Sequence, residues 1–256
     1  MPTVPAADTG AVPIPALAVD PDVDPVAPRV PDVLPDDAVA PRLLADRLER
    51  ARAHLLRTLP VADLAILTDD LDRGVAAQVA RPTGPVVGDT LPIATLSDHR
   101  DRPVRVAAPG RAAVVVLVRG VWCPFDNLTL AAYQRQVLPE LREHDVDLVA
   151  ISPQTPDAAE SMVVAHDLRF PLLTDPGGAY ARRLGLAHDL APAVSAVHGR
   201  LGTDLTRLHA GGEWVLPHPA TIVVNAAGVV RWAETHVDYT RRAEPARLLA
   251  AVRALG

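Results

Sequence analysis

The stretch AAVVVLVRGVWCPFDN, residues 112–127, decides the fold of this chain. Its first seven residues form a run of small and β-branched apolar side chains, which is typical of a strand buried on both faces. A proline then follows Cys123, and proline is well tolerated in the first turn of a helix, where its missing N–H has no partner to lose. The pattern therefore predicts a buried strand that passes directly into a helix, with Cys123 at the junction.

The flanking sequence continues this alternation of strands and helices. An apolar stripe over 128–141 predicts the helix after Cys123, and Pro139 is expected to kink it. The further elements expected from periodicity and turn residues are strands at 90–96, 104–107, 146–152, 170–174, 221–224 and 229–234, helices at 157–166, 178–184 and from residue 244, and an irregular insertion at 190–212. The order predicts an α/β protein with a central mixed sheet flanked by helices.

The chain divides into three parts by composition. Ten of the 26 prolines lie in residues 1–41, which predicts a disordered Pro-rich tail. Leucines at near-helical spacing then predict two packed helices, an N-terminal helical extension over 42–84. Residues 85–256 form the predicted α/β domain.

Composition excludes several classes of function. All 25 basic residues are Arg, so lysine-based Schiff-base chemistry, pyridoxal phosphate attachment and a P-loop lysine are excluded. A net charge of −6 with dispersed arginines gives no footprint for nucleic acid, and no apolar run reaches the ~20 residues of a membrane span. We expect neither nucleic acid nor a membrane as a partner.

Cysteine usage and the first residues indicate the compartment. Because Cys123 is the sole cysteine, no intramolecular disulfide and no cysteine-rich zinc site can form. Residues 1–20 contain no Arg and are interrupted by prolines, unlike a signal peptide, so we expect a cytoplasmic protein. The lysine-free, Ala- and Arg-rich bias is typical of a GC-rich bacterial genome.

Four dispersed motifs resemble one known family. They are Arg-Gly-Val-Trp-Cys-Pro-Phe-Asp-Asn at 119–127, Ser-Pro-Gln-Thr-Pro at 152–156, Pro-Ala-Thr at 219–221 and Asp-Tyr-Thr-Arg-Arg-Ala-Glu-Pro at 238–245. In this order they resemble AhpC/TSA-type, peroxiredoxin-like proteins. The resemblance covers residue 43 to the C-terminus and implies a thioredoxin-like (redoxin) fold.

The chain departs from the family at the chemistry. The second cysteine of the family's Cys-x-x-Cys, which aligns with the peroxidatic cysteine of ordinary peroxiredoxins, is Asp126 here. The resemblance also makes Pro219 a cis-proline that lies beside the active-site sulfur, and the residue before it is His218 rather than a small aliphatic residue. We therefore expect Cys123, Asp126 and His218 to converge.

Each of these three residues has a chemical and a structural interpretation. A helix N-terminus favours a thiolate and lowers the pKa of a thiol, so Cys123 is predicted to be a nucleophile, the alternative being a buried, inert cysteine. Asp126 either caps the helix start or accepts a proton. His218 could act as the base of a Cys-His-Asp arrangement. Alternatively, Cys123, Asp126 and His218 could form a three-ligand metal site. No metal is predicted as a cofactor.

The residues around the trio are expected to shape the site. Arg119 either stabilises a thiolate and binds an anionic substrate, or bonds nearby carbonyls as a structural arginine. Trp122, Phe125 and Pro219 are predicted to line the substrate pocket. A structural role is favoured for the remaining motif residues Tyr239, Arg241 and Arg242, and His188, His198 and His209 are interpreted as loop residues without metal-ligand spacing.

Three functions stay open from the sequence. The first is a peroxiredoxin-like monothiol oxidoreductase, in which Cys123 reacts with a peroxide or disulfide and an external thiol or thioredoxin-like reductant regenerates it, since the chain has no resolving cysteine. The second is a non-redox enzyme of specialised metabolism that uses Cys123, Asp126 and His218 on a small-molecule substrate. The third is a metal-binding protein that uses the same residues. No cofactor is predicted, and a homodimer is compatible with a redoxin fold.

Overall fold

The computed structural model describes residues 43–80 and 84–255, so the predicted tail at 1–41 lies outside the described residues. The strands are β1 (Ala94–Asp98), β2 (Pro103–Val106), β3 (Ala113–Leu117), β4 (Asp147–Ser152), β5 (Leu172–Thr174), β6 (Ala187–Asp189), β7 (Val215–Pro217), β8 (Ala220–Val224) and β9 (Val230–Thr235). The helices are α1 (Leu44–Thr58), α2 (Val61–Ala80), α3 (Pro124–Gln136), α4 (Leu138–Glu143), α5 (Pro156–His166), α6 (Ala179–Arg183), α7 (Pro192–Arg200), α8 (Leu205–Leu208) and α9 (Pro245–Arg253), with a 3₁₀ turn at Pro176–Gly178.

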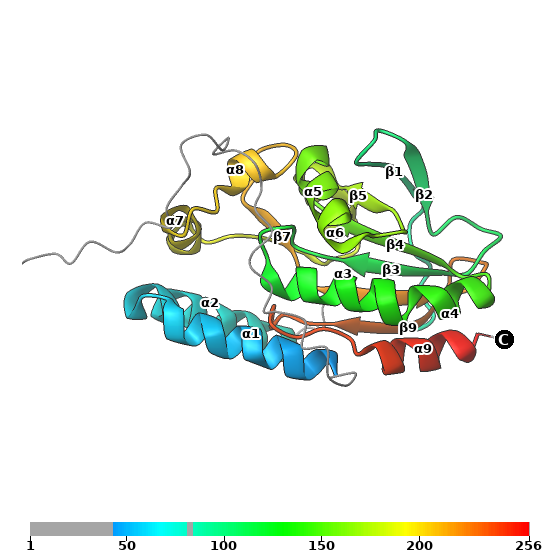
Figure 1. Ribbon diagram of the computed structural model, residues 1–256, viewed down its shortest axis with the longest axis horizontal. Coiled ribbons are helices and arrows are strands. Elements are labelled where there is room, and N and C mark those ends of the chain that lie inside the picture. The colour runs from blue at the N-terminus through cyan, green and yellow to red at the C-terminus, as the bar shows by residue number, and fades with distance from the viewer. Residues whose placement is uncertain (1–42, 81–83, 256) are drawn as a thin grey trace, which may run out of the picture.

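A mixed sheet forms the centre of the molecule (Figure 1). Within the described residues it has seven strands in the order β2-β1-β5-β4-β3-β8-β9, and β6 and β7 form a separate two-stranded sheet. Strand β3 runs parallel to β4 and antiparallel to β8. The predicted mixed α/β architecture of thioredoxin-like type is confirmed.

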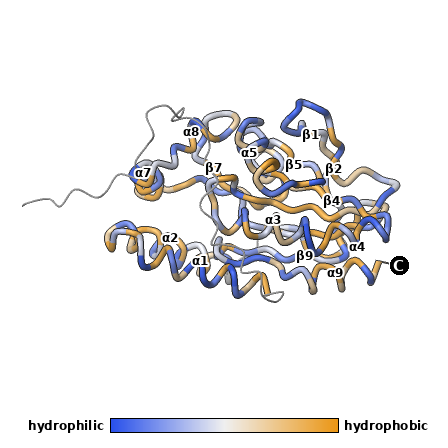
Figure 2. Tube along the Cα trace, in the orientation of Figure 1, coloured by the Kyte–Doolittle hydropathy of each residue, from blue (hydrophilic) through white to orange (hydrophobic). Residues whose placement is uncertain are grey.

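Strand β3 is buried on both faces, as its sequence predicts. Val114 and Val116 belong to one apolar cluster, whereas Val115 and Leu117 belong to the other, because successive side chains of a strand point to opposite faces. Figure 2 shows apolar residues running through the central strands, while α1 and α2 alternate between polar and apolar residues along their length. Each face of the sheet therefore needs its own cover of helices.

The two faces are covered unequally. Buried residues of α3, α4, α5 and α9 pack on the first face, and α1 adds Leu44, Leu48 and Ala51 to the same cluster. On the opposite face, Tyr180 and Ala181 of α6 pack against Val115 and Leu117 of β3 and their neighbours. Helix α3 is thus enclosed between the sheet and α1, and its first turn meets the end of β3 inside the protein.

Two details test the predicted elements. The helix after Cys123 divides at Val137, two residues before Pro139, because that proline cannot donate to the carbonyl four residues earlier. The expectation of an irregular segment at 190–212 is wrong, since it contains α7 and α8. Helix α7 is short, and its buried stripe of Val194, Val197 and His198 combines apolar residues with a histidine, which weakens the periodic signal.

None of the helices in 43–80 and 84–255 is both long enough and apolar enough to cross a lipid bilayer.

Candidate functional site

Cys123 lies at the junction of the buried strand and its helix, as predicted. It is the N-cap residue of α3, with extended backbone angles (φ −89°, ψ 113°), and Pro124 occupies the first helical position. The cysteine is only 1% exposed and belongs to the apolar cluster under α1 and α3. The sulfur is therefore at the helix start but closed off from solvent.

The turn between β3 and Cys123 depends on a glycine. Gly120 has φ +142°, a conformation that side-chain-bearing residues rarely adopt. A Cβ atom at this position would also lie 3.0 Å from Nε1 of Trp122 and 3.2 Å from Oε1 of Gln154. The glycine thus lets the chain pass close to these two side chains.

Two buried amide side chains hold the turn in place. The backbone N–H of Val121 donates to Oε1 of Gln154 at 2.8 Å. From the other side, Nδ2 of Asn127 donates to the carbonyls of Val121 at 2.6 Å and Cys123 at 2.9 Å, and its Oδ1 lies 2.7 Å from Nε2 of His166. The turn is thereby fixed to α3, α5 and the end of β4.

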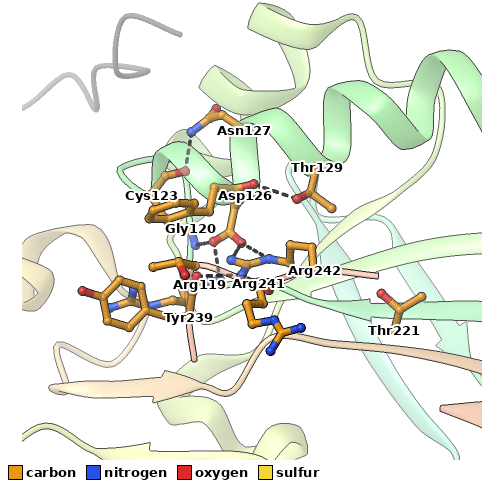
Figure 3. A network of polar contacts seen from close by, with 12 residues as sticks. Arg119, Gly120, Cys123, Asp126, Asn127, Thr129, Thr221, Tyr239, Arg241 and Arg242 are labelled. Carbon is orange, nitrogen blue, oxygen red and sulfur yellow. Dashed lines mark hydrogen bonds and ion pairs between the residues drawn. The ribbon is translucent and has the colours of Figure 1, made fainter. Parts of the chain in front are cut away.

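Asp126 forms a buried ion pair rather than a helix cap. Its Oδ2 accepts hydrogen bonds from the backbone N–H groups of Arg119 at 2.7 Å and Gly120 at 3.1 Å. Its Oδ1 accepts from the guanidinium of Arg242, from Nε at 3.2 Å and also from Nη2 (Figure 3). The predicted reach back to the Cys123 N–H is not observed, because that N–H donates to the Gly120 carbonyl. Asp126 is 0% exposed and its partners occupy both oxygens.

The pKa of Cys123 moves opposite to the expectation. Burial and, to a smaller extent, the Asp126 carboxylate raise the pKa of the Cys123 thiol to about 11, because the charges of Arg119 and Arg242 compensate only in part. The helix N-terminus alone favours a thiolate. Here the loss of solvent and a neighbouring negative charge outweigh it, so the predicted lowering of the pKa is wrong for this enclosed state.

Arg119 is held between two aromatic rings. Its Cζ lies 4.7 Å from the centroid of the Trp122 ring and 4.4 Å from that of Tyr239. Tyr239 in turn makes an edge contact with Phe125, with ring centroids 6.1 Å apart. Phe125 is only 1% exposed, so it supports the Tyr239 ring from behind, whereas Trp122 and Tyr239 are half-buried and reach towards the surface.

His218 does not join Asp126 in a hydrogen-bonded triad. Its ring stacks on that of His188, with centroids 4.3 Å apart and an interplanar angle of 15°. No cis peptide bond occurs in the described part of the chain, so the bond before Pro219 is trans and the expected cis-proline is wrong. The energy difference between the two forms of an X–Pro bond is about 1 kcal/mol, too small for sequence alone to decide. Pro219 is buried.

Three histidines interpreted as loop residues lie around Arg119 together with His218. Burial, aided by the positive charge of Arg119, lowers the pKa of each of the four, so all are neutral at neutral pH. The pKa is about 3 for His188 and His198, and about 4 for His209 and His218. The ring of His198 also meets the edge of Trp122 at 5.0 Å. The sequence carried no signal for this cluster beyond the residue types.

The structure does not support the three-ligand metal site. Within residues 43–80 and 84–255 no group of three or more His, Cys, Asp or Glu side chains is placed to hold a metal ion. The carboxylate that such a site needs, that of Asp126, is already bound by Arg242.

A pocket of about 440 Å³ has Arg242 in its lining, and neither Cys123 nor Arg119 lines it. It lies between α1 and the segment from β9 to α9. Its lining is dominated by polar and charged side chains: Glu49, Arg52, Glu234, His236, Asp238, Arg241, Arg242, Glu244 and Arg247. The pocket is therefore separate from the predicted site residues.

A thioredoxin-like sheet with a thiol at the strand-to-helix junction defines the class of redoxin proteins. The model of the AhpC/TSA family matches residues 87–233, more than half of the chain, so the chain belongs to this family. No curated protein sequence matches the chain.

Solved structures agree on the fold. The peroxidoxin BcpB from Mycobacterium tuberculosis is 18% identical with a TM-score of 0.52, covering 68% of this chain and 99% of its own. Reduced Prx3 from Vibrio vulnificus, in complex with H₂O₂, is 21% identical with a TM-score of 0.52, covering 66% and 99%. A peroxiredoxin-like protein from Aquifex aeolicus is 14% identical with a TM-score of 0.51, covering 67% and 88%. At these identities the likeness concerns the fold.

Proposed function

We propose that the protein is a thiol oxidoreductase in which Cys123 reacts with a peroxide or a disulfide and an external thiol regenerates it. The observation that carries the proposal is the position of this sole cysteine at the N-cap of α3, under the charge of Arg119. Membership of the AhpC/TSA family supports a redox role. Arg119, Trp122 and Tyr239 form the outer side of the proposed site.

The proposed cycle needs no second cysteine. The sulfur of the Cys123 thiolate attacks the terminal oxygen of a peroxide ROOH and the O–O bond breaks. The proton lost by the thiol ends on the departing RO⁻, so that Cys–SOH and ROH form. A first external thiol displaces water and forms a mixed disulfide. A second external thiol then attacks this mixed disulfide. Cys123 is released as a thiol, and the two external thiols leave joined in a low-molecular-weight disulfide. The external thiol reductant thus supplies both electrons.

The described state is a protected resting state in this proposal. With a pKa of about 11, about one Cys123 in 10,000 is ionised at pH 7. Reaction therefore requires the sulfur to be uncovered, which would return its pKa towards that of an ordinary thiol. Trp122 and Tyr239 are half-buried and pack against the cluster that contains Cys123, so in this proposal their displacement uncovers the sulfur.

The test measures consumption of hydrogen peroxide and of cumene hydroperoxide with a small thiol as reductant. The wild-type chain should turn over, Cys123→Ser should not, and a sulfenic acid should be trapped on the wild-type chain by a 1,3-dione and located by mass spectrometry. Ser161→Ala serves as the control, because within the described residues the Ser161 hydroxyl makes an exposed hydrogen bond to a carbonyl of its own helix. Absence of both turnover and trapped sulfenic acid in the wild type would refute the proposal.

A non-redox enzyme remains the second candidate, and the neutral ring of His218 favours it. The imidazole is unprotonated at neutral pH and can therefore accept a proton, but its pKa of about 4 makes it a weaker base than an ordinary histidine. In this case substrate turnover would continue without any oxidant or reductant and would be lost in His218→Phe. Asp126 is the weaker member of the predicted trio, since its carboxylate is occupied by Arg242.

The domain division is also a proposal. We assign residues 85–256 to the redoxin domain and 42–84, which contain α1 and α2, to an N-terminal extension. The pairing of two copies into a homodimer and a cytoplasmic location stay predictions.

A further inference from the structure

Two arginines are buried in this site, and they differ completely in their partners. Arg242, 7% exposed, donates to Asp126 and to the carbonyls of Tyr239 at 2.7 Å and Arg241 at 2.6 Å. Arg119, 6% exposed, has no carboxylate and no carbonyl on its guanidinium in the described residues, only the faces of Trp122 and Tyr239. A guanidinium withdrawn from water without a counter-charge is an unusual and unfavourable arrangement.

Further buried donors beside Arg119 lack an acceptor. Nε1 of Trp122 and Nε2 of Gln154 are both buried and have no hydrogen-bond partner among the described residues, and Gln154 is 0% exposed. The orientation of the Gln154 amide is fixed, because its Oε1 accepts from Val121 N–H. Both side chains face Gly120, where a Cβ atom would lie 3.0 Å from Nε1 of Trp122 and 3.2 Å from Oε1 of Gln154. The unsatisfied Trp122 N–H and the Gln154 amide group therefore both lie close to Gly120.

The surrounding side chains are apolar or neutral. Trp122 and Tyr239 flank the guanidinium, and the histidines around it carry no charge at neutral pH because burial and Arg119 lower their pKa. A single fixed cation, extra N–H donors and aromatic walls match a monoanion with an apolar body. The planar fork of an arginine suits a carboxylate, which it can bind through two parallel hydrogen bonds.

We propose that Arg119, with the N–H groups of Trp122 and Gln154, forms a binding subsite for the carboxylate of a small organic acid that has an aromatic or apolar body. Binding at this subsite involves no reaction of Cys123. For the proposed oxidoreductase it names a class of ligand, small organic carboxylates, to which hydrogen peroxide does not belong. The rings of Trp122 and Tyr239 contact the guanidinium and are half-buried, so in this proposal they are the side chains that a ligand has to displace.

The test is calorimetric titration of the full chain with phenylacetate, with the uncharged isostere phenylacetamide and with phenyl phosphate. Phenylacetate should bind best. Arg119→Gln should weaken its binding about tenfold to hundredfold, the range for a hydrogen bond to a charged group, and Arg119→Lys should weaken it less. The matched control is Arg183→Gln, since Arg183 is an exposed arginine whose Cζ lies 6.0 Å from the centroid of the Tyr180 ring, away from the site.

The outcomes separate this inference from the proposed function. Binding that persists in Cys123→Ser, while both peroxide turnover and trapped sulfenic acid are absent from the wild type, would refute the oxidoreductase and support the subsite. Equal affinity for phenylacetate and phenylacetamide, tighter binding of phenyl phosphate, or unchanged affinity in a folded Arg119→Lys chain would overturn the subsite. Circular dichroism of each variant establishes folding, and Arg119→Lys keeps the test decisive if Arg119→Gln does not fold.

Discussion

Acidification should destabilise this protein well above the pH at which carboxylates titrate. The cause is the cluster of His188, His198, His209 and His218, whose pKa values in the folded chain are about 3, 3, 4 and 4 against an ordinary 6.5. Because the folded pKa is lowered, the unfolded chain binds protons first as the pH falls. Stability is fully present above pH 6.5 and is lost progressively between pH 6.5 and the folded values.

The size of the effect follows from proton linkage. At pH 5.5 an unfolded histidine is about nine-tenths protonated, which lowers the free energy of unfolding by about 1.4 kcal/mol for each fully buried histidine. His198 and His209 are buried, whereas His188 and His218 keep partial exposure and contribute less. The expected loss between pH 7.5 and 5.5 is about 4 kcal/mol, a large share of the roughly 5–15 kcal/mol stability of a typical domain.

The assay is urea unfolding followed by far-ultraviolet circular dichroism at pH 7.5 and 5.5, at equal ionic strength. His198→Phe keeps an aromatic ring against Trp122 and should reduce the loss by about 1.4 kcal/mol. His144→Gln removes an exposed histidine and should leave the loss unchanged. A loss below about 1 kcal/mol in the wild type, or an undiminished loss in His198→Phe, would show that the cluster does not control acid stability.

Three further predictions concern the thiol turn. Alkylation of Cys123 by iodoacetamide at pH 7 should be at least about a hundredfold slower in the folded chain than in urea, because its pKa is about 11 instead of 9.0, and a ratio near one would contradict the enclosed thiol. Asp126→Asn should lower the free energy of unfolding by about 3–5 kcal/mol by leaving Arg242 unpaired, and adding Arg242→Met should restore part of it; a double variant no more stable than Asp126→Asn would refute the coupling. Gly120→Ala should lower the free energy of unfolding by about 1–3 kcal/mol, since its φ is +142°, and a melting temperature within error of wild type would contradict the strain.

The part of the fold that sequence predicts well is the part governed by local pattern. Residues 112–118 alternate between two apolar clusters as a buried strand must, and Pro124 begins α3 where its missing N–H has no cost. The break before Pro139 has the same local origin. Helix α7 was not predicted, because a short helix of nine residues with one histidine in its buried stripe gives little periodic signal.

The partners within the site depend on contacts between distant parts of the chain. Asp126 meets Arg242, 116 positions later, and sequence spacing gave no reason to prefer that arginine over a cap or over His218. Motif position could have helped, because Gln154 and Arg242 both stand in segments that resemble the family. The roles of both residues became visible only once β4 and the segment before α9 were brought to the thiol turn.

The charges of the buried groups explain two observations together. The Cys123 thiol is protonated, and the guanidinium of Arg119 has no counter-charge within the described residues. Asp126 neutralises Arg242, the surrounding histidines are neutral, and the protonated thiol of Cys123 adds nothing, so the site carries one positive charge, that of Arg119. One negative charge therefore brings the net charge of the site to zero, and a second would make the site negative. A Cys123 thiolate would supply that charge from within, and a bound carboxylate would supply it from outside. The two are alternatives, because both depend on the same guanidinium, and each occupied state opposes the other through Coulomb repulsion in a poorly solvated interior.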